Sequence, residues 1–270
     1  NLLGGIAVFA CLLLSLVWHL DREVAVAAPA EAEPISRSDG ERGSGWLSPR
    51  VRAYVELTKP RLMWLLSLLA LAGMALATIT GARLDGITVV ATLSGGVLAI
   101  GSAGTFNHVY ERDRDQRMAR TANRPVATDA VSPRRAALFG VGLFLLSMAV
   151  LLVVVNALAA ALTALAVAYY AGVYTIVLKP TTTWNTVIGG GAGALPAVIG
   201  WVAVTGSIGL PALVLAAVVF CWTPAHFYNL AIAYREDYAS AGYPMLSVVE
   251  GVDPTRRRIL YWLGATLLVA

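Results

Sequence analysis

The sequence predicts an all-α fold, a polytopic bundle of transmembrane helices, from its composition and from its long uncharged runs. Of its 270 residues, 58% are hydrophobic and only 13% are charged, and the mean hydropathy is +0.70. A soluble protein of this length does not need so much apolar surface. Uncharged runs long enough to cross a bilayer recur along the chain, at 62–82, 86–110, 136–178 and 180–234.

The third and fourth runs each have room for two helices, because one span needs about 20 apolar residues. We divide the third run at Asn156, within VVVNALAA, and the fourth near the Thr-Gly-Ser sequence at 205–207. Pro211 then opens the next helix, since proline is favoured in a first helical turn. These divisions predict six complete helices and a seventh that begins at Ile259.

The two ends of the chain lead us to expect that it is part of a longer protein. It begins with Asn rather than Met and stops within an apolar helix at Ala270. Residues 1–20 lack the basic region and the cleavage site of a signal peptide, so we expect an extra transmembrane helix, which could be the tail of a preceding domain. Residues 21–50 have the composition of a flexible linker. The main domain is then 51–270.

Basic residues indicate which side of the membrane each connection faces. Seven Arg and four acidic residues lie between 110 and 135, and further basic residues cluster at 50–61 and 256–258. By the positive-inside rule these segments face the cytoplasm, and counting helices puts all of them on one side. The opposite connections are short and nearly uncharged, at 83–85, 155–158 and 205–209. We therefore expect a cell-membrane protein, and no nucleic-acid ligand is needed to explain the basic residues.

The densest charge, NHVYERDRDQRMARTANRP at 107–125, directly follows the second apolar run. If that helix continues, Asn107, Glu111 and Asp115 recur every four residues and line one face. Two like charges one turn apart cost an isolated helix roughly 0.2–0.5 kcal/mol, and a bound divalent cation reverses the sign of that interaction. Three oxygen ligands of this kind suit Mg²⁺.

The spacing alone favours neither a metal site nor a solvated run of charges. The charges around this helix face decide between the two. Asp113 points elsewhere, and we expect it to pair with Arg117 at the surface. Arg120 and Arg124 follow at once. Cations beside a carboxylate-bound metal are what a diphosphate requires, so they favour the metal site.

A second charged cluster ends a later helix, in CWTPAHFYNLAIAYREDYASAGYPML at 221–246, and consists of Arg235, Glu236 and Asp237. Ionisable groups at membrane depth usually face the interior of a bundle. We therefore expect both clusters to converge on one polar cavity. Lys179, a lone cation at a helix end, is either a phosphate ligand or a side chain that reaches back to the interface.

Several segments in order carry a recognisable pattern: LTKPR at 57–61, N-x-x-x-[DE]-R-D-x-D-x-x-M-x-R-T-x-x-R-P at 107–125, Y-T-x-x-L-K at 174–179, WNTVIGG at 184–190, G-A-L-P-x-x-I-G-W at 193–201, WTPAHF at 222–227 and R-E-D-Y-x-x-A-G-x-P-M-L at 235–246. Together they resemble the UbiA superfamily of intramembrane prenyltransferases, and within it the heme-directed branch, the protoheme IX farnesyltransferases (heme O synthases). The resemblance runs from about Tyr54 to the end of the chain.

Two places depart from the superfamily pattern. The middle acidic position of the first motif is usually Asp, whereas here it is Glu111, which keeps the charge but reaches one methylene further. The second motif is D-x-x-x-D in most of the superfamily. Here Tyr234 and Tyr238 stand at those places, with Glu236 and Asp237 between them, as expected of the heme-directed branch and not of a quinone-type enzyme.

The resemblance implies a fold of nine helices, truncated here at the seventh. It also implies transfer of a farnesyl group from farnesyl diphosphate to a vinyl group of protoheme IX, with addition of water, to give heme O on the way to heme A. Membrane lipid would surround the farnesyl chain. A heme A synthase, fused or adjacent, is a candidate partner.

The resemblance further implies roles for the charged residues. Mg²⁺ would be held by Asn107, Glu111 and Asp115, and a second ion by Glu236 and Asp237. The diphosphate would face a set of cations, namely Arg120, Arg124, Lys179 and Arg235.

His226, in WTPAHF, has two interpretations. It would ligate or orient the heme iron, or it is a buried histidine with a backbone partner.

Two other functions remain open at this point, and a third is excluded. A quinone-precursor prenyltransferase of the same superfamily would accept an aromatic substrate. A cation transporter would need charged residues deep in several spans, and only His226 approaches this. A CDP-alcohol phosphotransferase would need a D-G-x-x-A-R sequence, which the chain lacks.

Overall fold

A computed structural model of the chain describes residues 47–270. The apolar helix predicted at 1–20, and all but the last residues of the linker predicted at 21–50, lie outside this range. Within the described residues every regular element is a helix, and Pro49–Val269 forms one compact unit. The predicted all-α class is confirmed.

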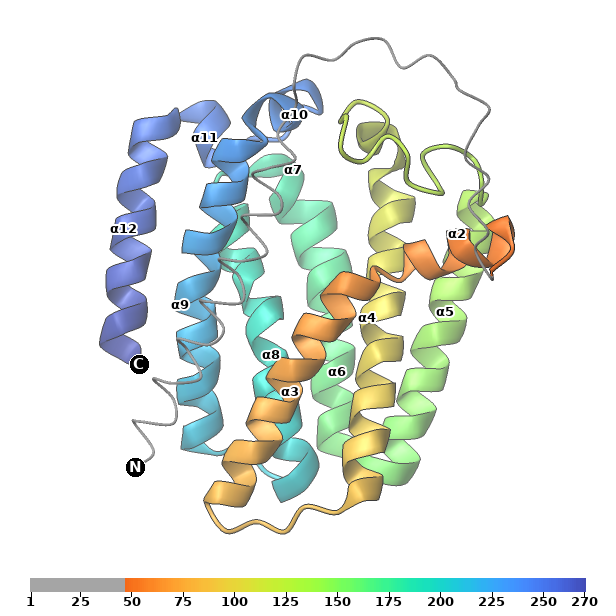
Figure 1. The fold of residues 1–270 in the computed structure, drawn as a ribbon, viewed down its shortest axis with the longest axis vertical. Helices are drawn as coiled ribbons and strands as arrows, with labels where there is room; N and C mark the ends of the chain where they lie inside the picture. The colour runs from red at the N-terminus through yellow and green to blue at the C-terminus, as the bar shows by residue number, and fades with distance from the viewer. Residues whose placement is uncertain (1–46) are drawn as a thin grey trace. The chain divides into compact units, whose positions relative to one another are not determined.

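Six helices of the described part are long and apolar enough to cross a membrane, and they lie at the six predicted segments (Figure 1). The chain is a multi-pass membrane protein. The spans are α3 (Pro60–Ile79), α4 (Gly86–Asp115), α5 with the wider π-helical turn η1 (Pro133–Val150 and Leu151–Val155), α6 with η2 and α7 (Ala157–Ala168, Tyr169–Leu178 and Lys179–Thr181), α8 (Asn185–Thr205) and α9 (Leu210–Ala233).

Both predicted breaks between paired helices are confirmed. Asn156 leaves the helical conformation and caps α6, because its side-chain oxygen accepts a hydrogen bond from the amide of Ala159 at 2.8 Å. Its side-chain nitrogen donates to the carbonyl of Val202 at 3.0 Å, which ties this break to α8. Gly206 ends α8 with a φ of 70°, a left-handed conformation that glycine adopts without strain.

The last helix starts earlier than predicted. α12 runs over Val252–Val269, whereas the sequence analysis placed its start at Ile259. The prediction followed the apolar run, but the three arginines at 256–258 belong to the same helix. Thr255 is buried in its first turns and donates to the carbonyl of Gly251 at 2.7 Å. α12 lies alongside α9 in Figure 1.

The bundle is closely packed where α3 and α8 cross. A Cβ atom added at Gly200 would lie 1.9 Å from the carbonyl oxygen of Ala70, and one at Gly73 would lie 2.0 Å from that of Ala197. Backbones come this close in membranes where small residues line both helices. The crossing holds the two spans in a defined register.

Several short elements lie at one end of the bundle, the upper end in Figure 1. Here α4 ends, and the connection 116–132 leads to α5. The segment after α9 forms α10 (Arg235–Ser240) and α11 (Leu246–Val249) at the same end. α2 (Pro49–Leu57) leads into α3, and all the predicted charged motifs lie on these elements or beside them.

Candidate active site

α4 continues without a break through the predicted acidic motif, as the spacing required. It begins at Gly86, where Asp85 caps it by accepting from the amide of Thr88 at 2.8 Å, and it ends at Asp115. Asn107, Glu111 and Asp115 are 2%, 2% and 1% exposed. Two carboxylates and an amide on one helix face are thus buried together, which is costly unless cations lie beside them.

Arg124 and Lys179 are the cations beside the two carboxylates. Arg124 donates to both oxygens of Asp115 at 2.8 Å and approaches Glu111 at 3.4 Å, and Lys179 donates to the other oxygen of Glu111. Both cationic side chains are themselves largely buried, at 17% and 12% exposure. Burial opposes the charge of Arg124, but the neighbouring Asp115 outweighs it and raises the pKa of the guanidinium.

Lys59 completes the cluster, and the sequence analysis assigned it no role beyond the basic end of a helix. It donates to the side-chain oxygen of Asn107 and to the hydroxyl of Tyr170 at 3.3 Å. Burial, followed by the positive charge of Arg124, lowers the pKa of the Lys59 ammonium to about 7. Its backbone is left-handed, with a φ of 56°, an unfavourable conformation that is often found at functional sites. The only sequence signal was LTKPR, in which this lysine precedes the proline that starts α3.

The π-helical segment η2 supplies the other wall of this cluster. The amide nitrogen of Asn107 donates to the hydroxyl of Thr175 at 3.2 Å, and Thr175 donates to the carbonyl of Tyr170 at 2.9 Å. The rings of Tyr170 and Tyr174 lie 5.5 Å apart. A π-helical stretch inside a longer helix is frequently found at a functional site.

Tyr243, in the segment between α10 and α11, is a second residue that the sequence analysis missed. Its ring lies 4.5 Å from the ammonium of Lys179 and 4.9 Å from the guanidinium of Arg114, so two cations share one aromatic ring. Tyr243 is 1% exposed, and burial raises the pKa of its hydroxyl. The contact joins the 235–246 segment to the cluster on α4.

The second charged cluster lies next to the first, but its members point in different directions. Asp237 accepts from the backbone amides of Ala119 and Arg120 at 3.3 and 3.4 Å, in the turn that follows α4. Arg235 donates to the carbonyl of Ser247 at 2.8 Å, and Glu236 is exposed.

Two arginines predicted to face the diphosphate differ in position. Arg124 is in the carboxylate cluster. Arg120 is exposed and lies with its guanidinium 5.0 Å from the ring of Tyr234. The structure therefore brings Arg124 and Lys179 to the predicted metal ligands. Arg120 lies instead on the ring of Tyr234, outside the carboxylate cluster.

The ion pair expected between Asp113 and Arg117 does not form among the described residues. α4 ends at Asp115, so Arg117 lies in a turn and no longer follows Asp113 by one helical turn. Arg112 instead pairs with Asp129 at 2.8 Å, across the 116–132 connection.

His226 lies on α9, about two turns before its end. Its ring stacks on that of Trp222, with the centroids 4.8 Å apart and the planes at 13°. The ring of Phe227 stands nearly perpendicular to it, with the centroids 5.3 Å apart. Its predicted role at a heme iron stays a prediction.

The donor set on α4 fits Mg²⁺. Among residues 47–270 no three His, Cys, Asp or Glu side chains gather as a metal site. The side-chain oxygen of Asn107 is buried on the same helix face as the carboxylates of Glu111 and Asp115 and is the third candidate oxygen ligand. These are hard oxygen ligands, and Mg²⁺ is commonly held by one or two carboxylates together with a phosphate and waters.

The fold and this cluster define the class of protein. It is a multi-pass membrane protein with a bundle of apolar helices and a buried polar site at one end, to which five segments of the chain contribute. Residues 66–270 match the UbiA prenyltransferase family. The chain belongs to the UbiA prenyltransferase family.

Curated relatives share much of the sequence. The chain is 73% identical over 274 residues to protoheme IX farnesyltransferase 2 of Natronomonas pharaonis, an alignment that covers 100% of this chain and 63% of that protein. It is 54% identical over 271 residues to protoheme IX farnesyltransferase of Halobacterium salinarum, covering 98% of this chain and 60% of that protein. The chain thus spans less than two thirds of the length of these relatives.

Solved structures share the fold at low sequence identity. A UbiA homolog from Archaeoglobus fulgidus, bound to GPP and Mg²⁺, aligns with a TM-score of 0.67 and 18% identity, over 80% of this chain and 76% of that chain. The apo structure of a UbiA homolog from Aeropyrum pernix K1 aligns with a TM-score of 0.63 and 18% identity, over 83% of this chain and 78% of that chain. These alignments establish the arrangement of the helices.

Proposed function

We propose that this chain transfers a farnesyl group from farnesyl diphosphate to a vinyl group of protoheme IX, with release of diphosphate and addition of water, giving heme O. The observation that carries the proposal is the buried Asn107–Glu111–Asp115 face with its three cations, in a chain 73% identical to a protein named protoheme IX farnesyltransferase 2. A membrane site with a charged end suits a substrate that has a charged head and a long apolar tail.

Mg²⁺ is the proposed cofactor, held by Asn107, Glu111 and Asp115. When bound, it neutralises charge on the departing diphosphate. The UbiA homolog of Archaeoglobus fulgidus was solved with GPP and Mg²⁺, which supports the assignment. The role of the protein side chains is to present these oxygens on one rigid helix face in a site largely closed to water.

Lys59, Arg124 and Lys179 are the proposed diphosphate-binding cations. Arg124 and Lys179 pair with the two carboxylates Asp115 and Glu111, and the Lys59 ammonium, whose pKa is lowered to about 7, adds a third cation for an anion to bind when it is protonated. Cations fixed where negative charge grows on the leaving group favour ionisation of the allylic bond. Arg120 and Arg235 stay predictions as further diphosphate ligands.

Four further predictions accompany this function. A second ion on Glu236 and Asp237 stays a prediction, as does heme binding by His226. We also propose that the acidic motifs face the cytoplasm in the cell membrane, from the placement of basic residues. A heme A synthase, fused or adjacent, is the proposed consumer of the product. Domain boundaries near residues 20 and 50 are likewise proposals.

The activity is tested with membranes that contain the full-length protein, incubated with heme B, farnesyl diphosphate and Mg²⁺. We expect heme O, separated by chromatography and identified by its mass, and we expect Asp115→Ala to abolish it. No heme O from the wild type, or an undiminished amount from Asp115→Ala, would contradict the proposal. Prenylation of 4-hydroxybenzoate in place of heme B would indicate the quinone-type alternative.

A further inference from the structure

The turn that follows α4 is bound by the short helix α10, more than a hundred residues later in the chain. The carboxylate of Asp237 accepts from the amides of Ala119 and Arg120 at 3.3 and 3.4 Å. The hydroxyl of Ser240, one helical turn on, donates to the carbonyl of Arg117 at 2.9 Å. The 117–120 turn is therefore hydrogen-bonded to α10 through both amide and carbonyl groups.

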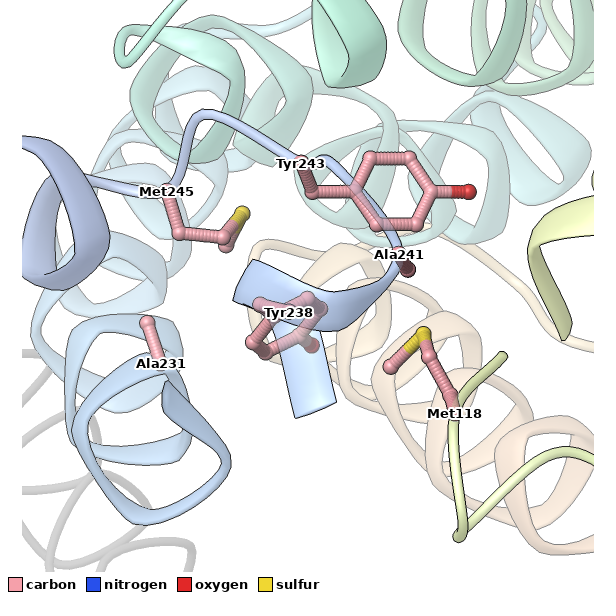
Figure 2. Close-up of a cluster of buried hydrophobic side chains, with 6 residues drawn as sticks. All are labelled: Met118, Ala231, Tyr238, Ala241, Tyr243 and Met245. Atoms are coloured by element: carbon pink, nitrogen blue, oxygen red, sulfur yellow. The ribbon is translucent and has the colours of Figure 1, made fainter. Parts of the chain in front are cut away.

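Apolar packing supports the same contact. Figure 2 shows Met118, which projects from the turn toward Tyr238 and Ala241. Met118 is 2% exposed and Ala241 1%, so the turn is anchored in a small core and does not merely lie on the surface. The cluster as a whole comprises Met118, Ala231, Tyr238, Ala241, Tyr243 and Met245.

The 117–120 turn also determines where Arg124 lies, next to the predicted metal ligand Asp115. The hydroxyl of Thr121 donates to the carbonyl of Asp115 at 3.2 Å, and the amide of Arg124 donates to the carbonyl of Thr121 at 3.0 Å. The chain thus folds back within a few residues, and the Arg124 guanidinium reaches Asp115 at 2.8 Å.

We infer that Asp237 is a positioning residue, whose carboxylate holds the 117–120 turn so that Arg124 stays on Asp115. In this role it is a ligand of backbone amides and not of a second metal ion. The effect on diphosphate binding rests on the proposed function, whereas the hold on the turn does not.

Three observations favour this role over metal binding. Both oxygens of Asp237 already accept from amides, so the carboxylate has hydrogen-bond partners in the absence of a cation. Its neighbour Glu236 is exposed. The two places where the superfamily pattern has aspartates hold Tyr234 and Tyr238, and a neutral phenol is a poor ligand for Mg²⁺.

The experiment compares Asp237→Ala, Asp237→Asn and the wild type as full-length protein in lipid nanodiscs. Hydrogen exchange of the peptide that contains Ala119 and Arg120 is followed by mass spectrometry, without substrate. We expect exchange to be at least about tenfold faster in Asp237→Ala, the change that corresponds to losing one hydrogen bond to a charged group. Asp237→Asn keeps one acceptor oxygen and should give an intermediate rate.

Bound metal is counted on the same proteins with Mn²⁺ as the probe, by electron paramagnetic resonance. We expect both variants to bind as many Mn²⁺ ions per chain as the wild type. Loss of one ion per chain in both variants, with exchange in the turn unchanged, would overturn the inference in favour of a second metal site.

The kinetic consequence separates positioning from general destabilisation. We expect KM for farnesyl diphosphate to rise roughly tenfold in Asp237→Ala and to recover partly in Asp237→Asn, with kcat changed less. Asp253→Asn serves as control, because Asp253 is an exposed aspartate on α12 that pairs only at the surface with Arg256 at 3.3 Å. If the wild type forms no heme O, the proposed function fails, and the exchange and Mn²⁺ measurements still judge the role of Asp237.

Ser240→Ala provides a second variant if Asp237→Ala does not fold. It removes the hydroxyl that contacts the carbonyl of Arg117 at 2.9 Å and the carbonyl of Asp237 at 2.8 Å, and it leaves both carboxylates of α10 in place. Faster exchange of the turn, with the number of bound Mn²⁺ ions unchanged, is the expected result. Exchange equal to the wild type in both Ser240→Ala and Asp237→Asn would contradict the inference.

Discussion

Lys59 reaches the site from outside every membrane-length helix. It precedes Pro60 in a left-handed conformation, and this directs the chain from α2 into α3. Its ammonium donates to Asn107, which is 48 residues away in the sequence. Burying the Lys59 ammonium beside Asn107 costs desolvation energy. We therefore expect this cation to contact a bound anion.

Replacing Lys59 with methionine removes the charge and keeps a flexible side chain of similar length. We expect Lys59→Met to raise KM for farnesyl diphosphate about tenfold and to change kcat less, because one charge-assisted contact to the diphosphate is lost. Arg61→Met is the matched control, since Arg61 is an exposed cation two positions later. Equal effects of the two substitutions would mean that only the general charge of this end matters.

The ring of Tyr243 offers a second test at this scale. Tyr243→Leu removes the ring that Lys179 and Arg114 share, whereas Tyr243→Phe retains it. A cation–π contact in a desolvated site contributes up to about 2 kcal/mol, so we expect KM for farnesyl diphosphate to rise several-fold in the leucine variant and little in the phenylalanine variant. Steady-state kinetics on both variants checks this, and a large effect in Tyr243→Phe would assign the role to the hydroxyl instead.

Among the elements, α3 and α8 form the closest crossing, and glycine makes it possible. At Gly200 an added Cβ would overlap the backbone carbonyl of Ala70, an atom that cannot move out of the way alone. The crossing positions α3, and through it the turn at Lys59.

We expect Gly200→Ala to lower stability by about 1–3 kcal/mol, as overpacking of a core does. Gly142→Ala is the control, because Gly142 is also within a helix and a Cβ there would meet nothing within 4 Å. Thermal unfolding in detergent, followed by tryptophan fluorescence, should show a lower midpoint for the first variant and no decrease for the second. An unchanged midpoint in Gly200→Ala would mean that the two helices separate at little cost.

The break at Asn156 combines two functions that substitutions can separate. Asn156→Ala removes both the cap on Ala159 and the bond to Val202, and we expect it to cost about 1 kcal/mol or more. Asn156→Asp keeps an acceptor for the cap and loses the donor to Val202, so its stability should lie between the two. The same unfolding measurement applies, and equal stabilities of all three proteins would show that the break needs no side chain.

For the whole molecule, the distribution of basic residues predicts one orientation. The 116–132 connection carries positive charge and the 205–209 connection does not. Single cysteines at Ala130 and Ser207, both exposed, would therefore lie on opposite sides. In a background in which the native Cys11 and Cys221 are replaced by serine, we expect a membrane-impermeant maleimide to label Ser207→Cys in intact cells.

Labelling of Ala130→Cys should require opening of the cells. Labelling of both positions in intact cells, or of Ala130→Cys alone, would contradict the predicted orientation. The experiment tests the positive-inside interpretation for this chain independently of its catalytic activity.

Much of the described fold could be predicted because its signals are local. The six spans, the breaks at Asn156 and Gly206, and the continuation of α4 through the Asn107–Asp115 face all depend on hydrophobic runs and a four-residue spacing. The start of α12 was placed too late because hydropathy marks the apolar part of a helix and not its charged first turns. The Asp113–Arg117 pair was wrong because the same spacing rule was carried past the end of the helix.

The sequence by itself determined the class of fold, the number of described spans and which face of α4 carries the side-chain oxygens of Asn107, Glu111 and Asp115. Only the tertiary structure decided which cations meet that face, since Lys179 reaches Glu111 from 68 residues away. It also decided which group holds the turn after α4, since Asp237 reaches Ala119 from 118 residues away. Helix formation follows from periodicity within one segment, whereas such pairings follow from how helices pack and where connections turn back. The physical reason is that a side chain's partner is set by distance in space, which no local pattern encodes.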